Sequence, residues 1–154
     1  MRLRPAAVGA SSPSRPHHAR PARAVAYLAA YEAVAAPDGG ALDSNPFELL
    51  AAHGATDVAD AGRNSIVAIR RNGRVSTVAA VPTTSVTVPF PVEMQAVPTA
   101  TAIGPDGALS VGQPTGFPLP VGGSTVWRIG LDGSLYVVEL ASTGLTTRAC
   151  RWAR

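Results

Sequence analysis

The sequence contains no lysine, one cysteine and few aromatic residues, and it has no long hydrophobic run. All 13 basic residues among the 154 are arginine, and aromatic side chains make up 5% of the chain. The single cysteine, Cys150, excludes an intramolecular disulfide framework and a zinc site built from cysteines. A membrane-spanning helix needs roughly 20 apolar residues in succession, so no transmembrane segment is expected.

Charge is distributed unevenly along the chain. Residues 1–26 carry five Arg and no acid, residues 148–154 carry three Arg, and the residues between them carry five Arg against ten acids. The net charge of +3 therefore comes from the two ends. A nucleic-acid-binding face needs basic residues grouped on a folded surface. The acidic middle of the chain offers no such group, so nucleic acid is not expected as a partner.

The ends of the chain also differ from the middle in composition. Residues 1–26 are rich in Arg, Pro and Ala without hydrophobic periodicity, and residues 146–154 form a second basic tail. Such segments are predicted to be disordered. Residues 24–36 are mostly Ala, Val and Tyr and stop at Pro37. They fit either a short helix or the apolar part of a secretion signal, so the compartment stays open.

The middle of the chain is a series of short β-type runs separated by turns. The predicted strands are 57–60, 65–70, 74–81, 85–88, 99–103, 108–112, 125–129 and 134–140. Asn72-Gly73, Asp106-Gly107 and Asp132-Gly133 provide the residues that two-residue hairpin turns prefer. No long helical pattern is present, so the fold class is predicted to be all-β with antiparallel sheets.

Two stretches of the middle region repeat. Residues 46–60 align with residues 98–112 at an offset of 52, and residues 64–73 align with residues 124–133 at an offset of 60. A unit of about 40–50 residues made of short strands is typical of a β-propeller blade.

A third similarity has a shorter spacing. Residues 103–111 resemble residues 129–137 at an offset of only 26, about half a unit. This spacing predicts that residues 134–140 open a further unit. It also predicts that roughly 20 residues, enough for two strands, are absent before them.

Four phrases of the sequence resemble a known family. They are DGGALDSNPFELLAA, VADAGRNSIVAIRRNGRVSTVA, GPDGALSVGQPTGFPLPVGGSTVWRI and DGSLYVVELASTGL. These phrases resemble the ScyD/ScyE family of bacterial β-propeller proteins, which is related to NHL-repeat and gluconolactonase-like (SMP-30-type) propellers. The resemblance covers about residues 27–145. It implies four-stranded blades and a generally exported protein, and it brings no assigned activity.

The length of the similar region limits how much of a propeller it provides. At about 45 residues per blade, residues 27–145 supply under three blades, whereas a closed ring has about 4–8. The expected fold is therefore an incomplete β-propeller of two to three blades behind a disordered N-terminus. Its two open sheet faces are expected to be apolar and available for self-association.

Asp60, Asn64 and Glu139 are the candidate metal ligands. The resemblance implies a divalent cation near the propeller axis, and carboxylate and amide oxygens are what a cation such as calcium prefers. Asp60 and Glu139 each follow a small or apolar run containing Val at the end of a predicted strand. The alternative is that Asp60 and Asn64 cap the turn between two strands by bonding to nearby backbone.

The loop at residues 112–123 is the most distinctive of the chain. It reads GQPTGFPLPVGG, with three prolines among its residues. Gln113, Phe117 and Leu119 are the candidate ligand rim, because stiff loops on a rigid scaffold commonly carry binding residues. The alternative is a loop packed across its own blade.

The resemblance therefore implies a non-catalytic propeller that binds a small ligand or a protein partner. A second hypothesis is a metal-dependent, lactonase-like hydrolase that uses Asp60, Asn64 and Glu139. A third is a non-functional fragment of a larger propeller. No G-x-S-x-G pattern is present, so a serine hydrolase with a nucleophile elbow is not expected.

Overall fold

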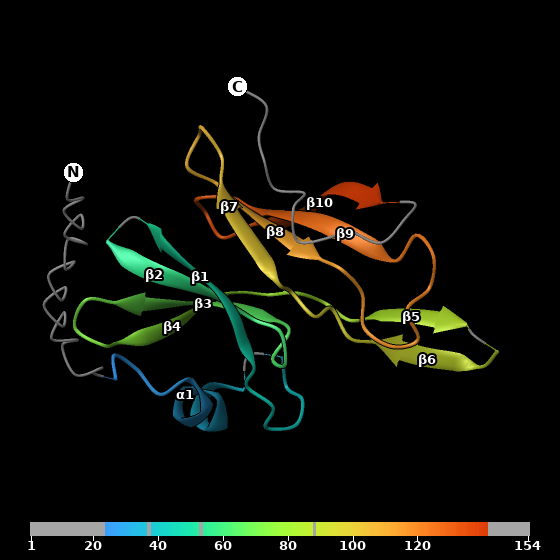
Figure 1. Cartoon of the computed structure of the whole chain (residues 1–154), viewed down its shortest axis with the longest axis horizontal. Helices are drawn as coiled ribbons and strands as arrows, with labels where there is room; N and C mark the ends of the chain where they lie inside the picture. The colour runs from blue at the N-terminus through green and yellow to red at the C-terminus, as the bar shows by residue number, and fades with distance from the viewer. Residues whose placement is uncertain (1–23, 37, 53, 88, 142–154) are drawn as a thin grey trace, which may run out of the picture.

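The computed structural model describes residues 24–36, 38–52, 54–87 and 89–141, and this part is all-β apart from one short helix (Figure 1). Helix α1 (Leu28–Ala35) precedes the strands. The strands are β1 (Pro46–Ala52), β2 (Ala55–Asp60), β3 (Ser65–Arg70), β4 (Val75–Ala80), β5 (Thr84–Thr87), β6 (Pro91–Met94), β7 (Ala100–Ile103), β8 (Leu109–Gln113), β9 (Ser124–Ile129) and β10 (Leu135–Ala141). Within the described ranges, no helix has the length and hydrophobicity that crossing a membrane requires.

The strands form three antiparallel sheets. The first sheet has the order β1-β2-β3-β4, the second has the order β10-β9-β8-β7, and β5 pairs with β6 as a hairpin. Strands that follow each other in sequence are neighbours in both larger sheets, so each of these sheets is a meander. The hairpin lies to one side of the two larger sheets (Figure 1). The predicted all-β class with antiparallel sheets is confirmed.

The two larger sheets pack against each other through a shared hydrophobic core. Its buried side chains come from both sheets and are Ala59, Ile66, Leu109, Val111 and Ile129. Successive residues of a strand point to opposite faces, so the inward side chains of each strand alternate with outward ones. The first strands of the two sheets also meet, because the Glu48 carboxylate accepts a hydrogen bond from the backbone N–H of Thr101.

The other face of the first sheet is covered by the segment that precedes it. Val58, Val67 and Ile69 are buried there, and Ala26, Leu28 and Tyr31 pack against them. The backbone N–H of Thr77 donates to the Tyr31 hydroxyl at 2.8 Å. Within residues 24–36, for which a short helix was one of two alternatives, the structure has helix α1. The expectation of two open sheet faces is wrong for this face, because α1 and its neighbours cover it.

The three Asn/Asp-Gly turns share one geometry, which differs from the predicted one. A two-residue hairpin turn with Asn-Gly needs positive φ at both residues. Here only the glycines have it, with φ of +81°, +82° and +81° at Gly73, Gly107 and Gly133. The side-chain oxygen of the preceding Asn or Asp accepts the N–H two residues further on in each turn. The loops are therefore three-residue turns that end in a bulged glycine.

Strand β10 completes the second sheet. Leu135 pairs with Ile129, and Ala141 pairs with Ser124, so β10 follows β9 as β4 follows β3. The prediction that residues 134–140 open a further unit is therefore wrong in this structure. The short turn at Gly133 returns the chain directly beside β9, and the two large sheets are equivalent four-stranded units.

Candidate functional site

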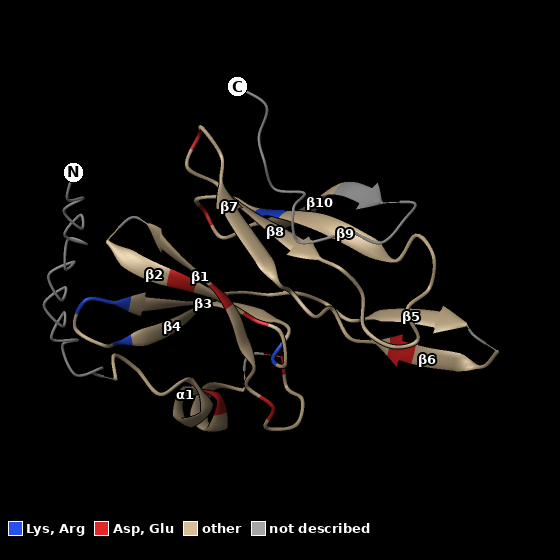
Figure 2. Ribbon diagram, viewed as in Figure 1, with Lys and Arg blue, Asp and Glu red and all other residues tan. Residues whose placement is uncertain are grey.

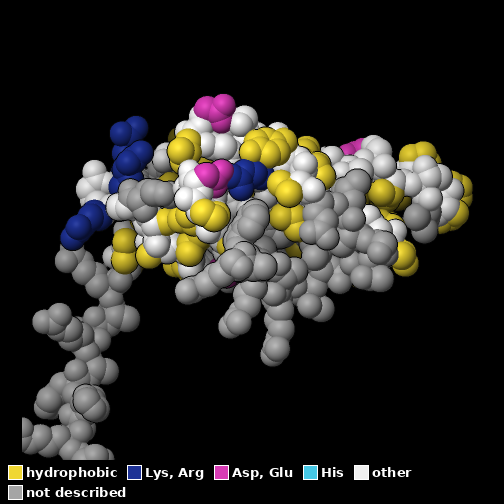
Figure 3. Space-filling view, turned by 90° about the horizontal axis from the view of Figure 1, so that it is seen from above, with side chains coloured by type: hydrophobic (Ala, Val, Ile, Leu, Met, Phe, Trp, Pro, Cys, Tyr) yellow, Lys and Arg dark blue, Asp and Glu magenta, His cyan; other side chains and the backbone are white. Residues whose placement is uncertain are grey.

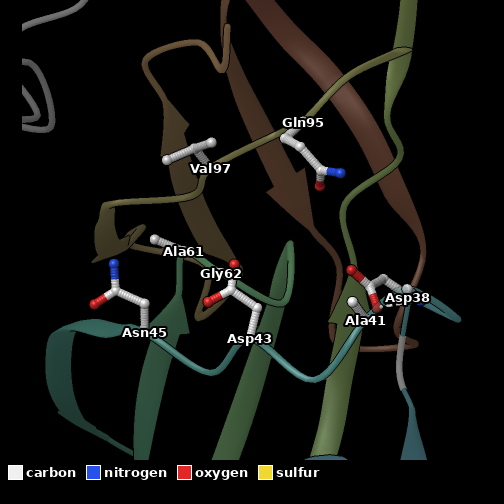
Figure 4. A pocket seen from close by; sticks show the side chains of 9 residues that line it. Asp38, Ala41, Asp43, Asn45, Ala61, Gly62, Gln95 and Val97 are labelled. Carbon is white, nitrogen blue, oxygen red and sulfur yellow. Dashed lines mark hydrogen bonds between the residues drawn. The ribbon is translucent and has the colours of Figure 1, made fainter.

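The candidate site is a polar pocket of about 340 Å³ at the end of the first sheet where β2 turns into β3 (Figure 4). Three segments that are distant in sequence meet there: the loop before β1, the β2–β3 turn and the linker after β6. The lining residues are Asp38, Gly40, Ala41, Asp43, Asn45, Ala61, Gly62, Gln95 and Val97. The pocket adjoins Asp60 and Asn64, which were predicted as metal ligands.

The loop before β1 lies directly on the β2–β3 turn. The Ala61 backbone N–H donates to the carbonyl oxygen of Asn45 at 3.0 Å. A Cβ added to Gly62 would lie 1.7 Å from the carbonyl oxygen of Asp43. Glycine is therefore required at this position, because any side chain would push the two backbone segments apart.

Arg63 is a buried cation beside the pocket. Its side chain is 2% exposed, and its Nε lies 2.9 Å from Oε1 of Glu32, which is 3% exposed. Its Nη1 donates to the carbonyl oxygen of Ala41 at 2.6 Å and lies 3.3 Å from Oδ1 of Asp38. Figure 2 shows acidic positions on α1 and on the loop before β1, on the same side of the first sheet as the β2–β3 turn. A buried charge requires such partners, so Arg63 fastens α1 and the following loop to the first sheet.

Asp60 is also buried, and both of its carboxylate oxygens accept hydrogen bonds. Oδ2 accepts from the Ser44 hydroxyl at 2.7 Å. Oδ1 accepts from the backbone N–H of Asn45 at 2.7 Å and from that of Arg63 at 3.3 Å. The Asp60 carboxylate therefore fixes both the loop before β1 and the turn after β2.

Asn64 connects the three segments that form the pocket. Its Nδ2 donates to Oδ2 of Asp38 at 3.2 Å and also to Oε1 of Gln95. Its Oδ1 accepts from the backbone N–H of Val97 at 3.0 Å. Its φ of +47° lies in the left-handed region, which Asn tolerates better than most residues.

The structure brings two of the three predicted metal ligands together. Asp60 and Asn64 lie at the same turn, whereas Glu139 lies on β10 of the second sheet, opposite Val126. Among the described residues, no three His, Cys, Asp or Glu side chains group as a metal site would require. The capping bond of the alternative interpretation is present at Asp60, which accepts from the Arg63 N–H. The Asn64 side chain instead bonds to distant segments, at Asp38 and Val97. The calcium site stays a prediction.

Saturating calcium is expected to leave the melting temperature of the chain unchanged, because Asp60 and Asn64 already use their polar atoms within the protein. A ligand at 100 times its dissociation constant adds about 2.7 kcal/mol of stability, which raises the melting temperature of a domain of this size by several degrees. The measurement is a thermal melt with calcium against one with EDTA. An increase that disappears in Asp60→Asn would contradict this expectation and support the hydrolase hypothesis.

Of the three residues predicted to form a ligand rim, one is buried in the structure and two are exposed. Gln113 is 1% exposed, and its Oε1 accepts a hydrogen bond from Nε1–H of Trp127 at 2.6 Å. It belongs to the interior of the second sheet, so its prediction as a rim residue is wrong. Phe117 and Leu119 are 78% and 66% exposed, and the neighbouring Val121 is 92% exposed.

The exposed loop is anchored at several points. The Gly116 N–H donates to the carbonyl oxygen of Gln95 at 3.0 Å, and a Cβ at Gly116 would lie 2.6 Å from that oxygen. The Ser124 hydroxyl donates to the carbonyl oxygen of Pro114. Figure 3 shows hydrophobic side chains at several places on the described surface. Three exposed hydrophobic side chains, Phe117, Leu119 and Val121, lie on the anchored loop 114–123.

Two exposed carboxyl groups have lowered pKa values. The hydroxyls of Ser85 and, to a smaller extent, Thr83 lower the pKa of Glu93 on the β5–β6 hairpin. Hydrogen bonds from Ser134 lower the pKa of Asp132 in the β9–β10 turn. A carboxyl group that acts as a general acid near neutral pH needs its pKa raised. The carboxylates of Glu93 and Asp132 therefore act as hydrogen-bond acceptors within their own hairpins.

Comparison with models of protein families gives no match to this chain, and comparison with curated proteins gives none either.

Proposed function

We propose that the chain is a non-catalytic β-propeller protein of the ScyD/ScyE type that binds a protein partner through the loop 114–123. Two four-stranded meanders with equivalent strand orders and a shared core support the propeller arrangement. The sequence repeats fall on equivalent strands, since residues 46–60 cover β1 and β2 while residues 98–112 cover β7 and most of β8. Neighbouring propeller blades are sheets of this kind.

The observation that carries the binding proposal is the exposure of Phe117, Leu119 and Val121 on an anchored loop. Fixed apolar side chains in water are favourable to bury against a partner. A loop that is already held by hydrogen bonds loses little conformational entropy when it binds. The chemistry of this surface fits a protein segment with apolar side chains of its own.

The non-catalytic part of the proposal follows from the pocket beside Asp60. The buried polar residues that adjoin this pocket, Asp60, Arg63 and Asn64, bond to one another's backbone or to neighbouring segments. An acid, base or nucleophile needs an atom directed at a substrate. These side chains are instead directed at the protein, where they hold the loops in place.

The loop proposal is tested by selecting peptides from a displayed random library on the full chain. Enriched peptides are expected to bind the double variant Phe117→Ser, Leu119→Ser at least tenfold more weakly than the unmodified chain. Truncating central apolar side chains of an interface commonly has effects of this size. Binding of the purified peptides is measured by fluorescence anisotropy.

Phe90→Ser is the matched control, because Phe90 is 74% exposed on the β5–β6 hairpin and lies outside the loop. It is expected to leave peptide binding unchanged. The proposal fails if no peptide is enriched. It also fails if the enriched peptides bind the loop variant as well as the unmodified chain.

A further inference from the structure

A second cavity, of about 360 Å³, lies between the two large sheets at the end opposite the polar pocket. Strand β2 runs from Ala55 at this cavity to Asp60 beside the polar pocket. Both sheets contribute to its lining, which consists of Ala52, Ala55, Asp57, Ala68, Arg70, Val78, Ile103, Gly107, Leu109, Ile129, Gly130 and Leu131. We call this cavity the inter-sheet cleft.

The cleft exists because small side chains of one sheet face branched side chains of the other. The first sheet lines the cleft with three alanines, Ala52, Ala55 and Ala68. The second sheet lines it with Ile103 on β7 and Leu109 on β8. Two sheets that pack face to face lie about 10 Å apart, and alanine is too short to fill its half of that space. Larger inward residues such as Ile66 close the core further along the strands.

Positive charge gathers at one side of the cleft. Arg70 lines it, and Arg71 and Arg74 flank the same β3–β4 turn, where Figure 2 shows the basic residues together. The Arg70 side chain forms no ion pair with any of the described residues. One acidic side chain, Asp57, also lines the cleft. An anionic group is favoured at the Arg70 side, because the guanidinium is positively charged at any ordinary pH.

We propose that the inter-sheet cleft binds a small apolar molecule that carries one anionic group. The apolar part lies among the alanines of the first sheet and the branched side chains of the second, and the anion pairs with Arg70. The volume of the cleft is about 360 Å³, and small-molecule sites have volumes of about 300–1,000 Å³. The cleft is thus within the size range of small-molecule sites.

Octanoate is the probe, and its binding to the full chain is measured by titration calorimetry. Octylammonium and 1-octanol have the same apolar tail with the opposite charge and with no charge. Octanoate is expected to bind with one site per chain, about fivefold more tightly than octanol, and octylammonium most weakly. Equal binding of the three would show that Arg70 is not used and would overturn the assignment of an anionic ligand.

Four variants locate the site. Ala68→Phe and Ala55→Leu each fill the cleft and are expected to lower octanoate affinity at least tenfold. Arg70→Gln is expected to lower it about fivefold. The control Arg71→Gln removes a neighbouring charge that does not line the cleft, and it is expected to change affinity less than twofold.

Circular dichroism in the near and far ultraviolet checks that each variant is folded, and two different filling variants guard against the failure of one. Unchanged octanoate affinity in a folded filling variant would overturn the proposal. The loop variant Phe117→Ser, Leu119→Ser is expected to bind octanoate normally. Failure of the loop proposal and failure of the cleft proposal are therefore distinguished.

Discussion

Replacing Arg63 with methionine is expected to lower the free energy of unfolding by about 3–5 kcal/mol, the usual effect of removing one partner from a buried ion pair. The Glu32 carboxylate would remain 3% exposed without its cation, and the carbonyl of Ala41 would lose its donor. The measurement is urea denaturation followed by circular dichroism. The size of the effect comes from the charge left behind in the protein interior rather than from the ion pair itself.

The double variant Arg63→Met, Glu32→Met separates these two contributions. Removing both charges leaves no unpaired carboxylate at position 32, where the side chain is most deeply buried, although Asp38 also loses its cation. The double variant is therefore expected to be more stable than Arg63→Met alone. Arg74→Met is the control, because Arg74 is exposed and its loss should change stability by less than about 0.5 kcal/mol. A double variant less stable than Arg63→Met would contradict a direct coupling between Arg63 and Glu32.

Replacing Ile66 with alanine is expected to lower the free energy of unfolding by about 2–5 kcal/mol. Ile66 is fully buried, and its side chain belongs to the core shared by the two large sheets. The loss combines the transfer free energy of the removed methyl and methylene groups with the cavity they leave. Val137→Ala, at a side chain that is 46% exposed, is the control and should cost much less.

The same core predicts that the two sheets unfold together. Ile66 and Val111 come from different sheets and belong to one buried cluster. The free-energy changes of Ile66→Ala and Val111→Ala are expected to be non-additive, with a coupling of about 0.5 kcal/mol or more. Fully additive changes, with separate unfolding transitions for the two sheets, would contradict the shared core.

Most strands were predictable from local patterns. The strand predicted at residues 65–70 is β3 to the residue, and those at 125–129 and 99–103 differ from β9 and β7 by one residue. These runs combine β-branched residues with clear turn signals on their flanks. The turn positions were also correct, although the type of turn was not. The φ of the residue before each glycine depends on a side-chain bond that composition does not reveal.

Strands β1 and β6 were missed, and both begin with proline. Proline lowers the expectation of a strand, yet it is tolerated at the first position of one. In β1 it is followed by Phe-Glu-Leu-Leu-Ala-Ala, and Leu, Glu and Ala favour helices. Pairing with β2 along nearly its whole length overrides that preference. A prediction from the residues of a short segment alone does not include the pairing of that segment with another strand.

The site was predictable only in part. Asp60 and Asn64 were singled out together, and they do lie at one turn. Arg63 lies between them in sequence, but an arginine is usually exposed, and nothing local indicates that Glu32 lies beside it. Gln95 comes from more than thirty positions away. The pocket depends on the meeting of three distant segments, which no local pattern encodes.

The order of the covering elements along the chain has a consequence for synthesis. The helix that shields one side of the first sheet is made before that sheet and is available as soon as it forms. The face of the first sheet that carries Ile66 is not fully covered until the ribosome has added residues up to Ile129. At about 5–20 residues per second this takes roughly 3–13 s. During that interval an apolar surface is exposed to other nascent chains, and a chaperone would have its greatest effect on the yield of folded protein.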